Sequence, residues 1–149
     1  MTERPPRLIL LLNSAQRRLQ QFIAAEQDQA ARGGHAAPTP AQGGVLFVLA
    51  REDGATMGRL ARALALAPSA VSGRVPRMES LGWVERRASA DDARAQQVWL
   101  LPAGAAQLPA LRKAVGRINE RLVDGFTPDE LRTVARWLAH VQTLGDPDE

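Results

Sequence analysis

Apolar residues recur at helical spacing toward both ends of this 149-residue chain. The first seam runs from Leu8 to Phe22 with intervals of four, three, four and three residues, and it predicts one long helix. A second seam with similar intervals runs from Leu108 to Phe126, and the pattern from Leu131 to Val141 predicts a last helix. Because two long apolar seams exceed what one small lobe buries, we expect a second copy of the chain to cover them.

The middle of the chain predicts shorter helices with recognisable starts. Thr39-Pro40-Ala41-Gln42 is typical of a helix start, because Thr caps, Pro fits the first position and Gln completes a capping box. Thr56 caps the next short helix. After a turn at 65–67, Pro68 begins a helix whose buried face recurs at helical spacing. Two helices joined by so tight a turn form a helix-turn-helix candidate.

The period then changes from helical to alternating. Residues 83–87 and 96–100 predict two strands, and the polar stretch from Ala88 to Ala95 predicts the hairpin between them. Trp83 and Trp99 are expected to pack where the strands meet the core, and a ligand-stacking role is the alternative for either. The order of elements predicts a mostly α fold with a small β-hairpin wing, a winged helix-turn-helix flanked by N- and C-terminal helices.

Composition narrows the chemistry that is available. The chain has no cysteine, which excludes disulfides, thiolate metal sites and cysteine catalysis. His35 and His140 are isolated, so no metal site and no cofactor are expected. No apolar run approaches the ~20 residues of a membrane span, and we expect a cytoplasmic protein. Asp91 and Asp92 are adjacent acids on a hairpin tip without a shaped pocket, and no phosphate-cradling loop is present, so an enzyme is not expected.

The net charge of +3 is a weak indication of nucleic-acid binding, but its distribution is stronger. Six arginines and two glutamates lie between Thr56 and Arg87, which gives that stretch a charge of six minus two, or +4. Arginine offers a planar fork that suits phosphates and guanine edges. The basic stretch therefore indicates DNA as the partner.

Particular residues are candidates for DNA contact. The helix that begins at Pro68 carries small or polar residues near its start, followed by arginines, as a helix entering the major groove requires. A single arginine on the narrow wing tip suits the minor groove, and Asp92 beside it could hold its guanidinium in place. Arg77 could instead pair with Glu79 or Asp91 as a surface residue. The candidate DNA-binding residues are Ser69, Ser72, Arg74, Arg77, Arg86, Asp92 and Arg94.

Residues 39–104 resemble the MarR family of bacterial transcriptional regulators. The matching features, in order, are "TPAQ", "LARAL", "SAVS", "MESLGWVERR" and "DDARA". The resemblance implies a homodimer that binds a pseudo-palindromic double-stranded DNA operator, with repression relieved by a small-molecule effector. Its expected parts are an N-terminal dimerisation helix over 1–32, a DNA-binding lobe over 39–101 and C-terminal dimerisation helices over 102–145.

Three departures from the family pattern fall in the DNA-binding lobe and just after it. Gly73 stands where the family usually has a larger, often basic residue. Pro76 lies inside the recognition helix, where it removes an amide donor and should kink the helix. "LLPAG" replaces the usual polar helix start. The alternative function is a winged helix that serves as a protein-interaction module without specific DNA binding.

Overall fold

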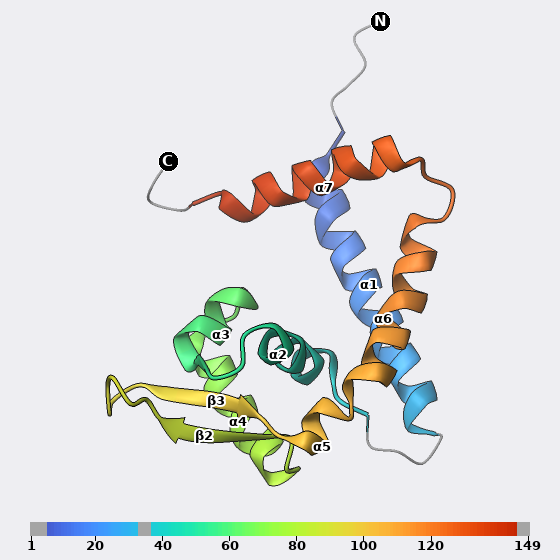
Figure 1. Ribbon diagram of the computed structural model, residues 1–149. Coiled ribbons are helices and arrows are strands. Elements are labelled where there is room, and N and C mark those ends of the chain that lie inside the picture. The colour runs from blue at the N-terminus through green and yellow to red at the C-terminus, as the bar shows by residue number, and fades with distance from the viewer. Residues whose placement is uncertain (1–5, 33–36, 146–149) are drawn as a thin grey trace, which may run out of the picture. The chain divides into compact units, whose positions relative to one another are not determined.

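The computed structural model describes residues 6–32 and 37–145 of the chain. These residues divide into two compact units, one within 1–114 and one within 115–149. The predicted fold, mostly helical with a small β-hairpin, is confirmed (Figure 1). In chain order the elements are α1 (Leu8–Ala31), α2 (Pro40–Arg51), β1 (Ala55–Thr56), α3 (Met57–Ala63), α4 (Pro68–Ser80), β2 (Val84–Ala88), β3 (Gln96–Leu100), α5 (Pro102–Ala105), α6 (Leu108–Val123) and α7 (Pro128–Thr143).

The helix starts that the sequence predicts are present as hydrogen-bonded caps. Thr39 Oγ1 accepts a hydrogen bond from the Gln42 amide at 3.2 Å, and Gln42 Oε1 accepts one from the Thr39 amide at 3.0 Å. Thr56 Oγ1 caps α3 by accepting from the Arg59 amide. These bonds satisfy amides that have no partner in the first helical turn, and they fix where α2 and α3 begin.

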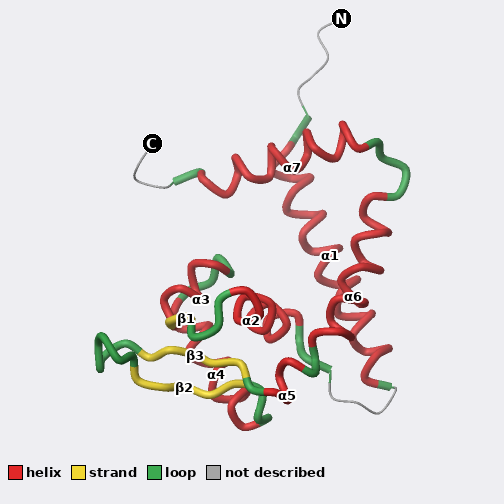
Figure 2. The backbone as a smooth tube through the Cα atoms, in the orientation of Figure 1, coloured by secondary structure: helices red, strands yellow, loops and turns green. Residues whose placement is uncertain are grey.

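The strands form a three-stranded antiparallel sheet in the order β1-β3-β2 (Figure 2). The predicted hairpin is present, with Val84 paired to Leu100 and Ala88 to Gln96. Strand β1 was not predicted. It contains only two residues, paired through Ala55 with Val98, and so short a segment leaves no alternating pattern in the sequence.

The hydrophobic core lies in the first unit, where α2, α3 and α4 pack with the sheet. Trp83 is buried as predicted, whereas Trp99 is half-buried and lies against the backbone at Gly54. Gly54 has a φ of +76°, and a Cβ there would stand 2.6 Å from the Trp99 ring. The core residues are Val45, Leu46, Leu49, Ala55, Leu60, Ala61, Val71, Val75, Met78, Trp83, Val84, Val98 and Leu108.

The flanking helices keep their apolar residues largely exposed. Helix α7 begins with a capping box formed by Thr127 and Glu130, yet none of its residues is buried. The predicted seam to Phe126 is too long, because α6 ends at Val123 and Phe126 lies in the turn before α7. No helix within 6–32 and 37–145 is long and apolar enough to cross a lipid bilayer. The exposed apolar residues of α1, α6 and α7 include Leu8, Ile9, Leu10, Leu11, Val115, Leu122, Val134 and Leu138.

Candidate nucleic-acid interface

Helix α4 presents three of its four predicted contact residues to solvent, and the fourth, Arg74, is half-buried. Its core face recurs at Val71, Val75 and Met78, each of them fully buried. Residues between these positions must therefore point outward on a helix of 3.6 residues per turn. Ser69, Ser72 and Arg77 are all exposed, as a helix that enters the major groove requires.

The two faces of the wing have different environments because side chains alternate along a strand. Val84 and Arg86 share the face of β2 that lies across from Val98, so Arg86 extends from the edge of the core. The other face carries Arg87, whose guanidinium lies 5.1 Å from the centre of the Trp99 ring and pairs with Glu85. Of the two consecutive arginines, Arg86 is therefore the one that faces α3 and α4.

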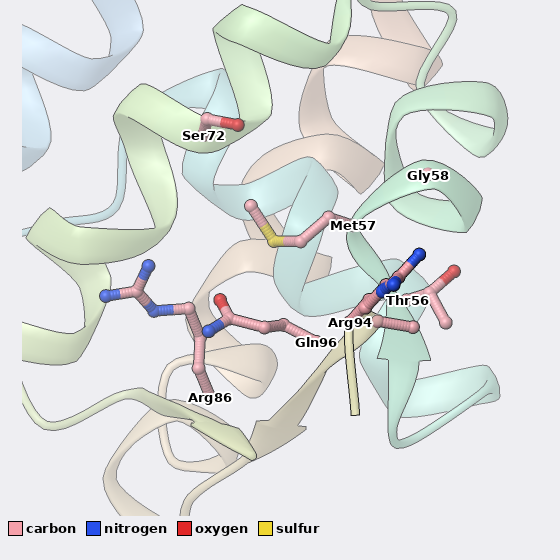
Figure 3. A pocket seen from close by; sticks show the side chains of 8 residues that line it. Thr56, Met57, Gly58, Ser72, Arg86, Arg94 and Gln96 are labelled. Atoms are coloured by element: carbon pink, nitrogen blue, oxygen red, sulfur yellow. The ribbon is translucent and has the colours of Figure 1, made fainter. Parts of the chain in front are cut away.

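A hollow of about 450 Å³ lies between α4, the start of α3 and the wing. Its lining includes Ser72, Arg86 and Arg94 from the predicted set and no carboxylate. In the view of Figure 3, Arg94 lies near Thr56 on one side, Arg86 lies on the other, and Met57 and Gln96 lie between them. The complete lining is Thr56, Met57, Gly58, Ser72, Arg86, Arg94, Ala95 and Gln96.

The wing tip is a hydrogen-bonded turn that leaves the Arg94 side chain free. Asp92 Oδ1 accepts a hydrogen bond from the Arg94 backbone amide at 2.9 Å. The Ser89 amide donates to the Ala95 carbonyl at 2.9 Å and closes the loop. Asp92 thus holds the backbone of the turn and not the guanidinium, which corrects the role expected for it. The Arg94 guanidinium makes no ion pair or hydrogen bond within the described chain and is exposed.

Two other predicted arginines have partners inside the lobe. Arg86 Nε lies 2.5 Å from Glu79 Oε1, so this ion pair joins the wing to α4. Because Glu79 is engaged with Arg86, it does not pair with Arg77, and no described residue forms an ion pair with Arg77. Arg74 Nη1 donates to the Ala70 carbonyl one turn earlier, at 3.4 Å. Arg77 and Arg94 are therefore the predicted cations whose charge is most available to a ligand.

Five other lining residues were not predicted as site residues: Thr56, Met57, Gly58, Ala95 and Gln96. One of them carried a usable signal. Gln96 stands two residues before the buried Val98, so strand alternation places it on the core-facing side of β3, beyond the end of the core. The sequence predicts Thr56 as a helix cap, and only the assembled lobe brings Thr56 and Met57 to the hollow.

One of the two histidines lies among the described residues. His140 lies exposed on α7, and His35 lies outside the described residues. Within 6–32 and 37–145, no three histidine or acidic side chains come together in an arrangement that could hold a metal ion.

Comparison with known proteins agrees with this geometry. The MarR family matches residues 38–95. A probable transcriptional regulator from Pseudomonas aeruginosa is 30% identical over 91% of this chain and 99% of its own, with a TM-score of 0.73. A mutant of MarR from E. coli, solved in complex with operator DNA, is 29% identical over 91% of each chain, with a TM-score of 0.70. No curated protein matches the chain.

A more distant solved structure shares the fold alone. It is BpsR of Bordetella bronchiseptica, 21% identical over 89% of this chain and 98% of its own, with a TM-score of 0.72.

An exposed recognition helix, a wing with a free arginine and a basic hollow between them define a winged-helix DNA-binding regulator. Together with the relatives above, they show that the chain belongs to the MarR family of transcriptional regulators.

Proposed function

We propose that this protein is a repressor that binds a pseudo-palindromic operator as a homodimer. The single observation that supports this most directly is the free Arg94 guanidinium, which shares a carboxylate-free hollow with Ser72 of α4. DNA in this position would receive α4 in the major groove and the wing tip in the adjoining minor groove, whose negative potential attracts arginine. Two half-sites centred about one helical turn apart would let both recognition helices face one side of the duplex.

The exposed apolar residues of the flanking helices support the dimer. Ile9 is 77% exposed on α1 and Leu122 is 51% exposed on α6. Apolar surface of this extent is costly in water unless a partner covers it. In a symmetric dimer the same helices of two copies would cover one another. The expected result of sedimentation at micromolar concentration is a species of twice the chain mass of 16.1 kDa.

The DNA contacts can be tested by titrating variants against the operator and a scrambled duplex. Arg94→Ala should weaken binding to both DNAs and lower the salt slope by about one unit per wing, since its contact is largely electrostatic. Arg77→Ala and Ser72→Ala should cost ~1–3 kcal/mol per lost base contact and act mainly on the operator.

Arg136→Ala on α7 is the matched control, because it removes the same charge outside the lobe. Residues two apart on a helix lie about 200° from one another, so Arg136 points away from the face that carries Val134 and Leu138. It should leave both affinities unchanged. If neither Arg77→Ala nor Arg94→Ala alters binding to either DNA, the protein-interaction module becomes the better proposal.

We also propose that a small molecule regulates DNA binding. The support is by analogy: the DNA binding of BpsR, which shares this fold, is regulated by 6-hydroxynicotinic acid. That acid is the first probe to add to the operator complex. A rise in the dissociation constant would support regulation by this class of compound, and an unchanged constant would eliminate this acid.

A further inference from the structure

Pro76 leaves one backbone carbonyl of the recognition helix without its usual partner. Helix α4 runs from Pro68 to Ser80 with Pro76 inside it. In an α-helix each carbonyl accepts from the amide four residues later, and proline has no amide hydrogen. The Ser72 carbonyl therefore lacks the i+4 donor that the other carbonyls inside the helix have. No side chain in the described chain donates to it either.

This carbonyl lies on the outer side of α4. Its peptide unit joins Ser72 to Gly73, and both residues are exposed, while the core face of the helix is formed by other positions. The proline ring presses against the carbonyl four residues before it and turns it away from the helix axis. Figure 3 shows Ser72 on the turn of α4 that borders the hollow.

Gly73 leaves the approach to this oxygen open. A Cβ built at Gly73 would meet no atom within 4 Å, so packing inside the lobe does not require a glycine here. Glycine also weakens a helix interior relative to alanine. The absence of a side chain at Gly73 would let another molecule come close to the backbone of α4 at this point.

We propose that the Ser72 carbonyl oxygen reads a base by accepting a hydrogen bond from the amino group of adenine or cytosine in the major groove. This inference rests on the proposed function, because it takes α4 as the helix that enters the groove. The N6 amino group of adenine and the N4 amino group of cytosine are the donors on major-groove base edges. Guanine and thymine offer oxygen acceptors at the corresponding positions, which a carbonyl oxygen repels.

The Ser72 carbonyl can distinguish a base edge that donates a hydrogen bond from one that accepts it, whereas the neighbouring hydroxyls cannot. The hydroxyl of Ser69 or Ser72 rotates and either donates or accepts, so it tolerates both kinds of base edge. A peptide oxygen only accepts, and the helix fixes its direction. Pro76 thus acts as a positioning residue: it does not touch the DNA, but it frees the acceptor that does.

The test compares the base preferences of the wild-type protein and Pro76→Ala, selected from a pool of random duplexes. Alanine restores an amide that bonds to the Ser72 carbonyl. The wild type should prefer an amino-bearing base at one position of each half-site, and Pro76→Ala should lose that preference by about 3- to 10-fold. The remaining positions of the operator should keep their preferences. Gly73→Ala, which leaves the carbonyl free but crowds it, should lose the same preference.

A second arm removes the amino group from the DNA instead of the acceptor from the protein. The operator is synthesised with purine in place of that adenine, or 2-pyrimidinone in place of that cytosine. The substitution should weaken the wild type by the same factor and leave Pro76→Ala unaffected. If Pro76→Ala fails to fold by circular dichroism, Gly73→Ala takes its place in this arm.

The outcomes separate this inference from the function on which it rests. A wild-type protein that selects no sequence at all would overturn the proposed function and this inference with it. A wild type that selects an operator, with Pro76→Ala and Gly73→Ala showing identical base preferences to it, would overturn this inference alone. This inference would also be overturned if removing the amino group from the DNA lowered the affinity of the wild type and of Pro76→Ala equally.

Discussion

The winged-helix lobe and the flanking helices both carry apolar residues at regular spacing, but they bury them to very different extents. In the lobe, Leu46, Leu60 and Met78 are 0% exposed. On α7, no residue is buried, and Leu138 remains 39% exposed. The lobe encloses its core within one chain, whereas the flanking helices leave most of their apolar residues exposed to solvent. Apolar residues at helical spacing therefore indicate a face that packs against another surface. The spacing does not indicate whether that surface belongs to the same chain.

Close backbone approaches occur at and beside the lobe, whereas the described glycines of the flanks, like Gly73 and Gly82 of the lobe, stand in open space. Just after the lobe, a Cβ at Gly104 in α5 would stand 2.2 Å from the Trp83 carbonyl oxygen, so α5 lies directly against the residue that precedes β2. The same carbonyl accepts a hydrogen bond from the Leu101 amide at 2.9 Å. In the flanks, Gly116 and Gly125 have nothing within 4 Å of an added Cβ. Close backbone contacts between α5 and Trp83 therefore add to apolar burial in holding the end of the lobe together.

The largest expected effect comes from one truncation made in both regions. Leu46→Ala should lower the free energy of unfolding by ~2–5 kcal/mol, because it leaves a cavity in an enclosed core. Leu138→Ala should cost less and act mainly on the proposed dimer, raising its dissociation constant by about 10-fold. Urea denaturation at two protein concentrations and sedimentation on dilution measure both effects.

If the two truncations had the same effect on stability and on self-association, the lobe and the flanks would not differ in the way described. Leu46→Ala should show the same stability loss at both concentrations, relative to wild type at each. A Leu138→Ala protein that matches the wild type in mass on dilution and in denaturation midpoint would show that this part of α7 covers nothing.

Features set by neighbouring residues could be predicted from the sequence. Thr39 and Gln42 lie three residues apart, so the cap they form depends on nothing distant. The buried face of α4 followed from its period, because Val71, Val75 and Met78 share one side of any helix. The wing followed from the change of period at 83–100, and the helix-turn-helix order followed from these elements.

Features that depend on assembly could not be predicted. The Arg86–Glu79 ion pair needs β2 to pass beside α4, and no local pattern of residues predicts that arrangement. The hollow draws residues from β1, α3, α4 and the wing, so its lining was only partly foreseen. Strand β1 has two residues and α5 has four, which is too few for an alternating or helical period to repeat.

The next effect concerns two glycines that both lie in helices. Gly104→Ala should destabilise the lobe by ~1–3 kcal/mol, because its methyl group collides with a backbone carbonyl that has little room to move. Gly73→Ala should instead stabilise the fold by ~0.5–1 kcal/mol, since alanine is the better helix former and the space is open. Thermal denaturation of the two variants measures the contrast. Equal shifts of the same sign would show that the close approach of α5 to Trp83 does not constrain the lobe.

The smallest effect distinguishes the two capping boxes, one in the lobe and one in the flank. Backbone and side-chain hydrogen bonds from Thr127 lower the pKa of Glu130, which is fully exposed. A carboxyl whose pKa is lower in the folded chain adds stability above its unfolded pKa, and that contribution disappears as the pH falls through the folded pKa. The start of α7 should therefore weaken in acid. The corresponding box at the start of α2 uses the neutral Gln42, so it should be indifferent to pH over the same range.

Side-chain titration followed by NMR measures this difference directly. The pKa of Glu130 should lie below the value for an unstructured glutamate, and Thr127→Ala should return it toward that value by removing the hydroxyl from the box. Thr39→Ala is the matched variant in the lobe and should leave the titration of Glu130 unchanged. A Glu130 pKa at or above the unstructured value would mean that the carboxylate does not cap α7 in solution. The helix start in the flank would then depend on Thr127 and Pro128 alone, unlike its counterpart in the lobe, where both members of the box take part.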